Sequence, residues 1–212
     1  MILKTGARLS IFPLGGALLF PRGTLPLHIF EPRYRALVRD SLARDRRIAM
    51  IQPRPGQSEK NPELFDIGCV GRIAHVEALE DGCFNLVLEG LSRFRLLREL
   101  DATTPFRQIE AGFDDFADGD EEDQPVLPSI LRAELEREAR AFADAHGYVV
   151  DWDGVERLDD EALVNGIAQI APFDIAAKQA LLEAPDVPDR ADLLIQFMRF
   201  FSRSDDDGAT LQ

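Results

Sequence analysis

The stretch LSIFPLGGALLFPRGTLPLHIFEPRYRALV, residues 9–38, holds two short apolar runs separated by turn residues, and it decides the fold. The runs Leu9–Phe12 and Leu25–Phe30 are rich in Ile, Leu and Phe, which favours strands, and the prolines and glycines between them favour turns. Pro32 suits the first position of a helix, where its missing N–H is not needed. The stretch therefore predicts a strand pair followed at once by a helix. The apolar face of that helix consists of Tyr34, Leu37, Val38 and Leu42.

A second β region is predicted at residues 66–100. Asp81–Gly82 is a strong signal for a two-residue hairpin turn. Gly90 is predicted to form a second turn. Residues 90–94 nearly match the GxSxG motif of serine hydrolases, and this near-match is assigned to the same turn. Beyond it apolar and charged residues alternate, which predicts one buried face and one charged face. The alternating residues are Phe94 and Leu96 on the apolar side and Arg93 and Arg95 on the charged side.

The chain has two cysteines, Cys69 and Cys83, and they do not form a CxxC motif. With the register set by the predicted turn, Cys69 faces a position near Phe94 and lies beyond the reach of Cys83. Both are therefore interpreted as separate buried thiols, and neither a disulfide framework nor a zinc site is indicated.

The composition changes after residue 113. Seven of the ten residues from Asp114 to Asp123 are acidic, which is typical of a solvated connection, and the pattern beyond them is helical. Gly147 is predicted to end a first helix with an apolar stripe, Asp159–Asp160 to begin a second, and Asp174 and Asp189 to cap two more. The stripe of the first helix is Leu127, Ile130, Leu131, Leu135, Ala139 and Phe142. The predicted organisation is a β-rich subdomain at 1–113, an acidic linker at 114–125, a helical subdomain at 126–203 and a frayed tail at 204–212.

Several segments together resemble the amino-terminal, substrate-binding domain of Lon-type ATP-dependent proteases. They are the opening stretch, GCVGRI at 68–73, EGLSRFRL at 89–96 and AKQALLEAPDVPDRADLLIQFM at 177–198, in the family's order. The resemblance covers roughly residues 8–202 and implies a PUA-like β pseudo-barrel with one or two helices, followed by a carboxyl-terminal helical bundle. Strands first and helices after independently predict an α+β fold.

A complete protease of that type needs a phosphate-binding GxxxxGK[ST] loop and a Ser–Lys pair. The lysines are Lys4, Lys60 and Lys178, and no glycine precedes any of them. The expectation is a stand-alone, non-catalytic domain with no cofactor. The histidines, at positions 28, 75 and 146, are far apart in sequence and are interpreted as ordinary ones, although a triad stays open at this stage.

Two acidic segments were compared with the EF-hand loop, and no metal site is predicted from either. With Gly119 at the sixth position, Phe116 and Pro125 occupy positions that require carboxylates. With Gly154 at the sixth position, Val149 occupies the first position, which must also supply an oxygen ligand. A solvated run of charges explains these segments better.

The formal charge of −14 is unevenly distributed, with +3 over residues 1–110 and −17 over residues 111–212. Such acidity disfavours nucleic-acid binding, and no run approaches the ~20 apolar residues that a membrane helix needs. Residues 11–19 lack the features of a signal peptide, so a cytoplasmic location is expected.

One basic cluster stands out on or just after the first helix, and it is made of Arg33, Arg35, Arg39, Arg44, Arg46 and Arg47. One interpretation is a solvent-facing side that complements the acidic half of the chain. The other is a docking patch for an acidic partner, with Arg33, Arg35, Arg39 and Tyr34 as the partner-binding residues. The remaining family-motif residues are interpreted as structural: Pro13, Pro21, Phe30, Glu31, Glu89, Gly90, Arg93 and Phe94.

The resemblance implies a module that binds polypeptides or another protein, such as unfolded segments or a separate protease, with a role in protein quality control or as a proteolysis adaptor. Binding would use an apolar groove, at the sheet edge or between the two subdomains, that accepts an exposed hydrophobic segment by strand addition or by groove docking. The alternative is a pseudo-barrel that holds a small-molecule or nucleotide-like ligand, possibly as an enzyme. The oligomeric state is left open.

Overall fold

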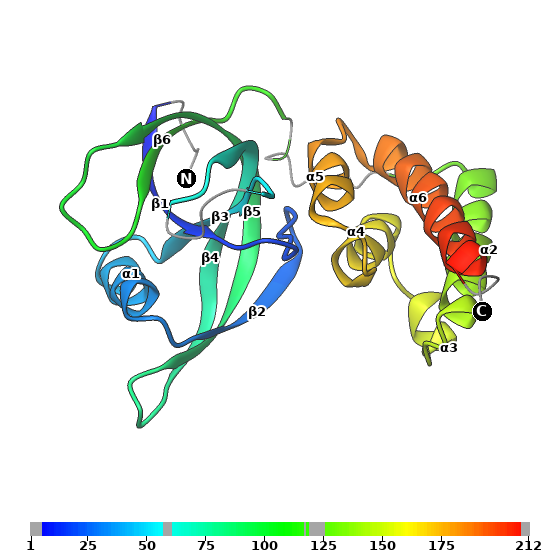
Figure 1. The fold of residues 1–212 in the computed structure, drawn as a ribbon, viewed down its shortest axis with the longest axis horizontal. Helices are drawn as coiled ribbons and strands as arrows, with labels where there is room; N and C mark the ends of the chain where they lie inside the picture. The colour runs from blue at the N-terminus through cyan, green and yellow to red at the C-terminus, as the bar shows by residue number, and fades with distance from the viewer. Residues whose placement is uncertain (1–5, 57–60, 117, 119–125, 209–212) are drawn as a thin grey trace. The chain divides into compact units, whose positions relative to one another are not determined.

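The computed structural model describes residues 6–56, 61–116, 118 and 126–208 (Figure 1). The chain divides into two compact units, Met1–Asp120 and Glu121–Gln212. The first is β-rich and the second is helical, so the α+β fold class predicted from the sequence is confirmed. Most of the predicted acidic linker lies outside the described residues.

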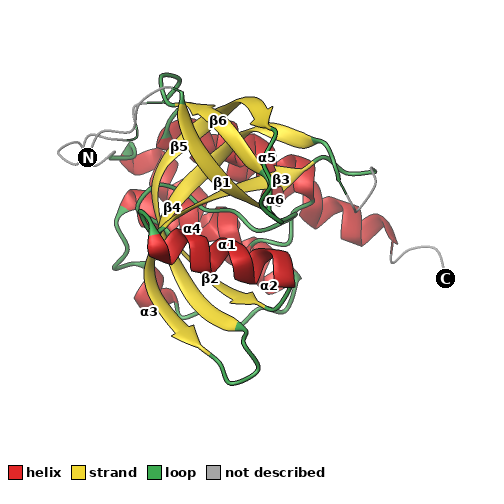
Figure 2. Ribbon diagram, turned by 90° about the vertical axis from the view of Figure 1, so that its left-hand side faces the viewer, coloured by secondary structure: helices red, strands yellow, loops and turns green. Residues whose placement is uncertain are grey.

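The first unit is a six-stranded mixed sheet that closes into a barrel (Figure 2). The strand order is β2-β5-β4-β3-β1-β6, and an additional pairing between β5 and β6 closes the ring. Strands β1 and β3 are parallel, and the other pairs are antiparallel. The elements are β1 Ala7–Pro13, β2 Thr24–Ile29, α1 Pro32–Ala43, β3 Arg47–Pro53, β4 Leu64–Ala78, β5 Phe84–Leu100 and β6 Gln108–Gly112.

The barrel interior is filled by apolar side chains from all five strands of the ring. Phe94 of β5 is fully buried among them. Interiors of small barrels are packed in this way and leave no channel. The cluster consists of Leu9, Ile11, Ala49, Ile51, Leu64, Val70, Phe94, Ile109 and Ala111.

Strand β5 runs without interruption through Gly90, so the turn predicted there, and with it the turn assigned to residues 90–94, is wrong. Its first half pairs with β2 and its second half with β6, while β4 lies alongside both halves. A Cβ at Gly90 would lie 1.9 Å from the carbonyl oxygen of Phe20. Glycine is therefore needed for a close backbone approach inside a strand, and not for a turn.

The β4–β5 hairpin forms where it was predicted, but its loop has three residues instead of two. Leu79 N–H donates to the Cys83 carbonyl at 3.0 Å, and Gly82 N–H donates to the Leu79 carbonyl at 2.9 Å. Gly82 has a φ of +79°, as expected for the left-handed residue that closes a three-residue loop. Cys69 lies opposite Arg93, next to the position predicted for it.

Strands β1 and β2 do not pair with each other, in contrast to the strand pair predicted from residues 9–38. Strand β1 lies between β3 and β6, and β2 lies on the outer side of β5. The connection between them carries Leu18, Leu19 and Phe20, which are buried. This apolar connection packs into the unit and takes the chain to a different side of the sheet.

Helix α1 starts at Pro32, as predicted. Tyr34, Leu37 and Val38 are buried on its inner face, whereas Leu42 is only half-buried and Ser41 takes the remaining buried position. The position of the helix against β1 and β3 thus follows from its first two turns.

Over its described residues, 126–208, the helical unit has five helices: α2 Ser129–Ala145, α3 Trp152–Val155, α4 Asp160–Ile170, α5 Ile175–Glu183 and α6 Val187–Gly208. Asp159 and Asp174 cap α4 and α5 through their carboxylates, as predicted. Helix α6 starts two residues before the predicted cap, because Asp186 accepts from the Asp189 N–H at 2.8 Å. It continues to Gly208, into the segment predicted as a frayed tail.

The apolar stripe predicted for α2 is only partly buried. Leu135, Ala139 and Phe142 lie inside, and Gly147 follows the helix with a φ of +68°. Ile130 is 83% exposed in the first turn, and Leu127 is buried before the helix begins. The part of the chain that the structure describes has no helix that is both long and apolar enough to cross a membrane.

Candidate functional site

The β2 edge, defined here as residues 24–30, is the open side of the barrel sheet. Strand β2 is the last strand of the sheet order, and no described strand pairs with its outer side. Gly90 N–H donates to the Gly23 carbonyl at 2.8 Å, so the carbonyl of Gly23 points toward β5. Backbone direction alternates along a strand. The groups of Pro26 and His28 therefore point away from β5, into the space beside the sheet.

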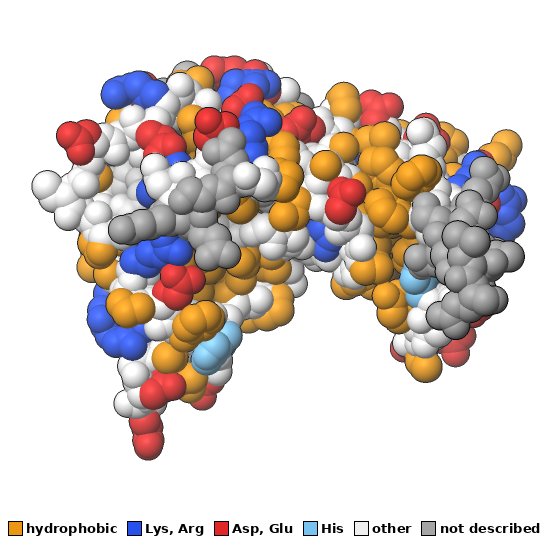
Figure 3. All heavy atoms as spheres, viewed as in Figure 1, with side chains coloured by type: hydrophobic (Ala, Val, Ile, Leu, Met, Phe, Trp, Pro, Cys, Tyr) orange, Lys and Arg blue, Asp and Glu red, His pale blue; other side chains and the backbone are white. Residues whose placement is uncertain are grey.

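The β2 edge also exposes apolar side chains on one face. Phe30 is 62% exposed directly after β2, and its ring stacks near the His28 ring with centroids 6.2 Å apart. Pro26 is exposed and lies opposite Val87 of β5, which is half-buried. Hydrophobic side chains gather where β2 lies, next to a histidine (Figure 3). What distinguishes Phe30 from other exposed apolar residues is the open strand beside it, to which another extended chain can add.

Polar residues on the same face hydrogen-bond to one another across three strands. His28 Nδ1 lies 2.8 Å from Asn85 Oδ1, and Asn85 Nδ2 donates to a Glu77 carboxylate oxygen at 3.2 Å. Two rows farther along on this face, Arg72 pairs with Glu89 at 2.6 Å. These pairs satisfy polar groups within the sheet and leave the apolar side chains between them available.

The turn before β2 holds a residue in an uncommon conformation. Gly23 N–H donates to the Phe20 carbonyl at 3.0 Å, and Arg22 between them has a φ of +60°. Glycine usually occupies this position of such a turn. Arg22 N–H donates to the Gly90 carbonyl at 2.9 Å, which ties the start of β2 to the middle of β5.

The six arginines predicted as a cluster have separate contacts. Arg33 pairs with Glu31 at 2.9 Å, and its guanidinium lies 4.5 Å from the centre of the Tyr34 ring. Arg35 lies against Gly82 of the β4–β5 loop, and Arg39 lies over the Phe84 ring at 5.6 Å. The first part of the cluster therefore contacts the β4–β5 hairpin and the start of the helix.

The other three arginines lie at the end of α1 and beyond it. Arg44 pairs with Asp40 at 3.0 Å, and Arg46 donates to the Ile73 carbonyl at 3.3 Å. Arg47 begins β3. The cluster is thus distributed over several elements instead of forming one free face of the helix.

Tyr34 is buried and packs against Phe12, with ring centroids 4.2 Å apart. Burial raises the pKa of its hydroxyl, and Arg33 opposes that shift. These contacts give Tyr34 the packing role that its place in the motif also favours, and its partner-binding role stays a prediction.

Most of the motif residues interpreted as structural have structural contacts. Pro13 pairs with Ile51, Pro21 is buried in the turn before β2, and the carboxylate of Glu31 binds Arg33 instead of capping α1. Phe30 differs, because its ring is exposed and so contributes little to the core.

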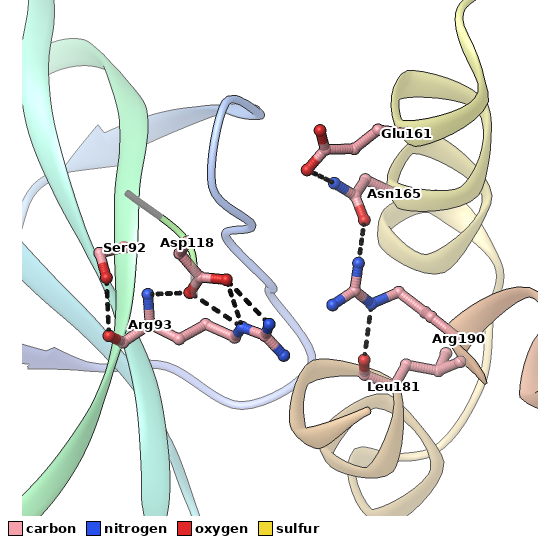
Figure 4. A network of polar contacts seen from close by, with 7 residues as sticks. All are labelled: Ser92, Arg93, Asp118, Glu161, Asn165, Leu181 and Arg190. Atoms are coloured by element: carbon pink, nitrogen blue, oxygen red, sulfur yellow. Dashed lines mark hydrogen bonds and ion pairs between the residues drawn. The ribbon is translucent and has the colours of Figure 1, made fainter. Parts of the chain in front are cut away.

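Arg93 is buried, although the alternation in β5 predicts that it faces solvent. It is 4% exposed and pairs with Asp118, 8% exposed, at 2.8 Å (Figure 4). Its backbone N–H also donates to Asp118 at 2.8 Å, and Phe116 stacks on its guanidinium at 3.9 Å. The start of the acidic segment is therefore fastened to β5. A residue 25 positions away makes this contact, which is why local alternation does not reveal it.

The helical unit has a buried arginine of its own. Arg190 donates to the Leu181 carbonyl and to Asn165 Oδ1, each at 2.8 Å, and Asn165 Nδ2 lies 3.5 Å from Glu161 (Figure 4). Lys178 is also buried, and burial lowers its pKa. These contacts join α4, α5 and α6.

Both cysteines are free and buried, as predicted. Burial raises the pKa of the Cys69 thiol, which keeps it protonated and unreactive at neutral pH. Among the described residues, no three or more His, Cys, Asp and Glu side chains come together as a metal site.

The family model described as the ATP-dependent protease La (LON) substrate-binding domain matches residues 8–199. The chain belongs to the LON substrate-binding domain family. The resemblance inferred from the sequence is thereby confirmed.

The LON domain relatives are much longer than this chain. Lon protease 2 of Myxococcus xanthus is 27% identical over 196 residues, which cover 90% of this chain and 23% of that protein. Lon protease of Escherichia coli K12 is 24% identical over 193 residues, which cover 90% of this chain and 24% of that protein. The chain thus spans about a quarter of the length of these relatives.

Two solved structures share the LON domain fold. The Lon N-terminal domain protein from Xanthomonas campestris has a TM-score of 0.63 at 23% identity, covering 91% of this chain and 99% of that one. The N-terminal domain of Mycobacterium avium complex Lon protease has a TM-score of 0.64 at 16% identity, covering 91% and 98%.

Within this LON domain, sequence reasoning missed the open position of β2. The sequence pattern assigns Phe30 a structural role in the strand and His28 the role of an ordinary histidine. The one available signal was Pro26, because a proline inside a strand pattern indicates an edge strand.

Proposed function

We propose that this LON domain binds exposed, extended segments of other polypeptides at the β2 edge and has no catalytic activity of its own. The observation that carries the proposal is the open strand with the exposed Phe30 ring beside it. Such a surface offers hydrogen bonds to a peptide backbone and apolar contact to its side chains. The matching family is described as a substrate-binding domain, and this description supports the same role.

The substrates we propose are unfolded or partly unfolded proteins, because these display apolar segments that folded proteins bury. A role in protein quality control follows, either beside a separate protease or as an adaptor that delivers substrates to one. We propose a cytoplasmic location together with this role in quality control. The filled barrel interior argues against the alternative of a small molecule held inside the barrel.

The arginines of α1 are a second part of the proposal. Arg39 is exposed beside the hairpin, and Arg33 is half-buried near the start of α1. We propose that they favour acidic segments next to the apolar one. Arg35, which lies against the hairpin loop, is assigned mainly to packing.

Fluorescence anisotropy with labelled casein, a largely unfolded protein, tests the proposed function. We expect saturable binding in the micromolar range, competition by unlabelled casein, and weaker competition by a folded protein of similar charge. Casein and ATP should stay intact during the measurement. Absence of binding by a folded chain would overturn the proposal, and so would hydrolysis that a single substitution abolishes.

If Arg39→Glu binds casein as tightly as wild type does, the α1 arginines are not part of the binding site. The matched control is Arg44→Glu, since Arg44 is also exposed, at the C-cap of α1, and among the described residues pairs only with Asp40, one turn back.

A further inference from the structure

We infer that the β2 edge binds its polypeptide as an added β-strand, with His28 supplying the backbone contact and Phe30 the side-chain anchor. This inference rests on the proposed function and specifies its mode. The bound segment is extended, carries an apolar residue next to Phe30, and is recognised chiefly through its main chain.

The first argument concerns backbone direction. The Gly90 N–H to Gly23 carbonyl bond fixes which backbone groups of β2 point to β5. By alternation, the N–H and C=O of His28 and the C=O of Pro26 point outward. Their spacing is that of a strand, so the partner they fit is another extended backbone.

The second argument concerns Pro26, which limits what the edge accepts. Proline has no N–H, and open strands often contain one because it discourages pairing between identical edges. A second copy of this chain would bring a second Pro26 to the pairing. A foreign segment without proline brings an N–H at every position. The edge is therefore better matched to another polypeptide than to itself.

The third argument concerns the side chains beside His28. Phe30 lies on the same face as Pro26 and His28, since the three positions alternate along the strand, and it is 62% exposed. The neighbouring polar side chains, Asn85 and Glu77, are already bonded across the sheet. An apolar side chain of an added strand can cover Phe30 without leaving those groups unsatisfied.

The experiment compares two substitutions at the same residue in the full chain. His28→Ala removes the side chain and keeps the outward N–H, whereas His28→Pro removes both and leaves the ladder with β5 intact. With labelled casein as the probe, we expect His28→Pro to bind about five- to tenfold more weakly than His28→Ala, the loss of about one hydrogen bond. Pro26→Val restores an outward N–H and should bind severalfold more tightly than wild type.

The possible results distinguish a failure of the added-strand mode from a failure of the proposed polypeptide binding. If wild type binds casein and the two His28 variants bind equally, the added-strand mode is wrong and the proposed function stands. If wild type does not bind at all, the proposed function fails first. If sedimentation shows that wild type dimerises and that His28→Pro prevents this, a second copy is the occupant and the inference is overturned.

Folding of each variant is checked by its thermal unfolding midpoint. Should His28→Pro fail to fold, hydrogen exchange on the wild-type chain decides instead. The His28 amide should exchange more slowly when casein is bound, while the amides of β6, on the closed side of the barrel, should not change. Unchanged exchange at His28 under saturating casein would contradict the inference.

Discussion

The two halves of β5 differ in what lies beside them. The second half pairs with β6, closes the barrel and places Phe94 in its core. The first half pairs with β2, which ends the sheet and exposes Phe30. The half that pairs with β6, called the closed half, completes the ring of strands around Phe94, so it supplies stability. The half that pairs with β2, called the open half, also buries its own apolar side chains, but the outer backbone groups of β2 and the Phe30 ring stay available beside it, so this side is suited to binding.

The largest expected effect is a loss of stability from a substitution in the closed half of β5. Phe94→Ala removes a fully buried ring and leaves a cavity, so we expect a loss of about 4 kcal/mol in the free energy of unfolding. Urea denaturation followed by circular dichroism measures it. A loss below about 1 kcal/mol would show that the core does not depend on this ring.

The next effect concerns the fastening of the acidic segment to the closed half. Asp118→Ala leaves the buried Arg93 guanidinium without its carboxylate, and we expect a loss of about 3 kcal/mol. Arg93→Met with Asp118→Ala should recover part of that loss, because no unpaired charge remains buried. If the double variant is less stable than the sum of the two single changes predicts, the pair is not coupled in this way.

Gly90→Ala tests the junction between the two halves. The new Cβ would meet the Phe20 carbonyl, so the turn before β2 must move, and we expect a loss of about 2 kcal/mol together with weaker casein binding. Gly166→Ala is the control, since nothing lies within 4 Å of its Cβ position. Equal binding by Gly90→Ala and wild type would show that the open half does not depend on this junction.

The smallest effect on stability is expected at the open half. Phe30→Ser changes a ring that is mostly exposed, so the free energy of unfolding should change by less than about 0.5 kcal/mol. Casein binding should nevertheless fall about tenfold, because the apolar anchor is lost. Exposed Phe200 of α6 supplies the matched control, and Phe200→Ser should leave binding unchanged. A large loss of stability in Phe30→Ser would return Phe30 to the structural role predicted from the sequence.

Local patterns were sufficient for the start of α1, the caps at Asp159 and Asp174, and the free cysteines. Each depends on residues close together in the chain, or on a register set by one hairpin. The turn at Gly90 was predicted wrongly because glycine signals both a turn and a close backbone approach. Only the position of Phe20, 70 residues earlier, distinguishes the two.

The sequence by itself determined the family, the α+β class and most of the helix boundaries, because these depend on motifs and on short-range periodicity. Only the tertiary structure decided which strand ends the sheet, why Arg93 is buried and why Phe30 is exposed. Strand order and ion pairs between distant residues arise from long-range contacts, which hydrophobic periodicity does not encode. The candidate site lies among these features, since a strand becomes an edge only through the neighbours that it lacks.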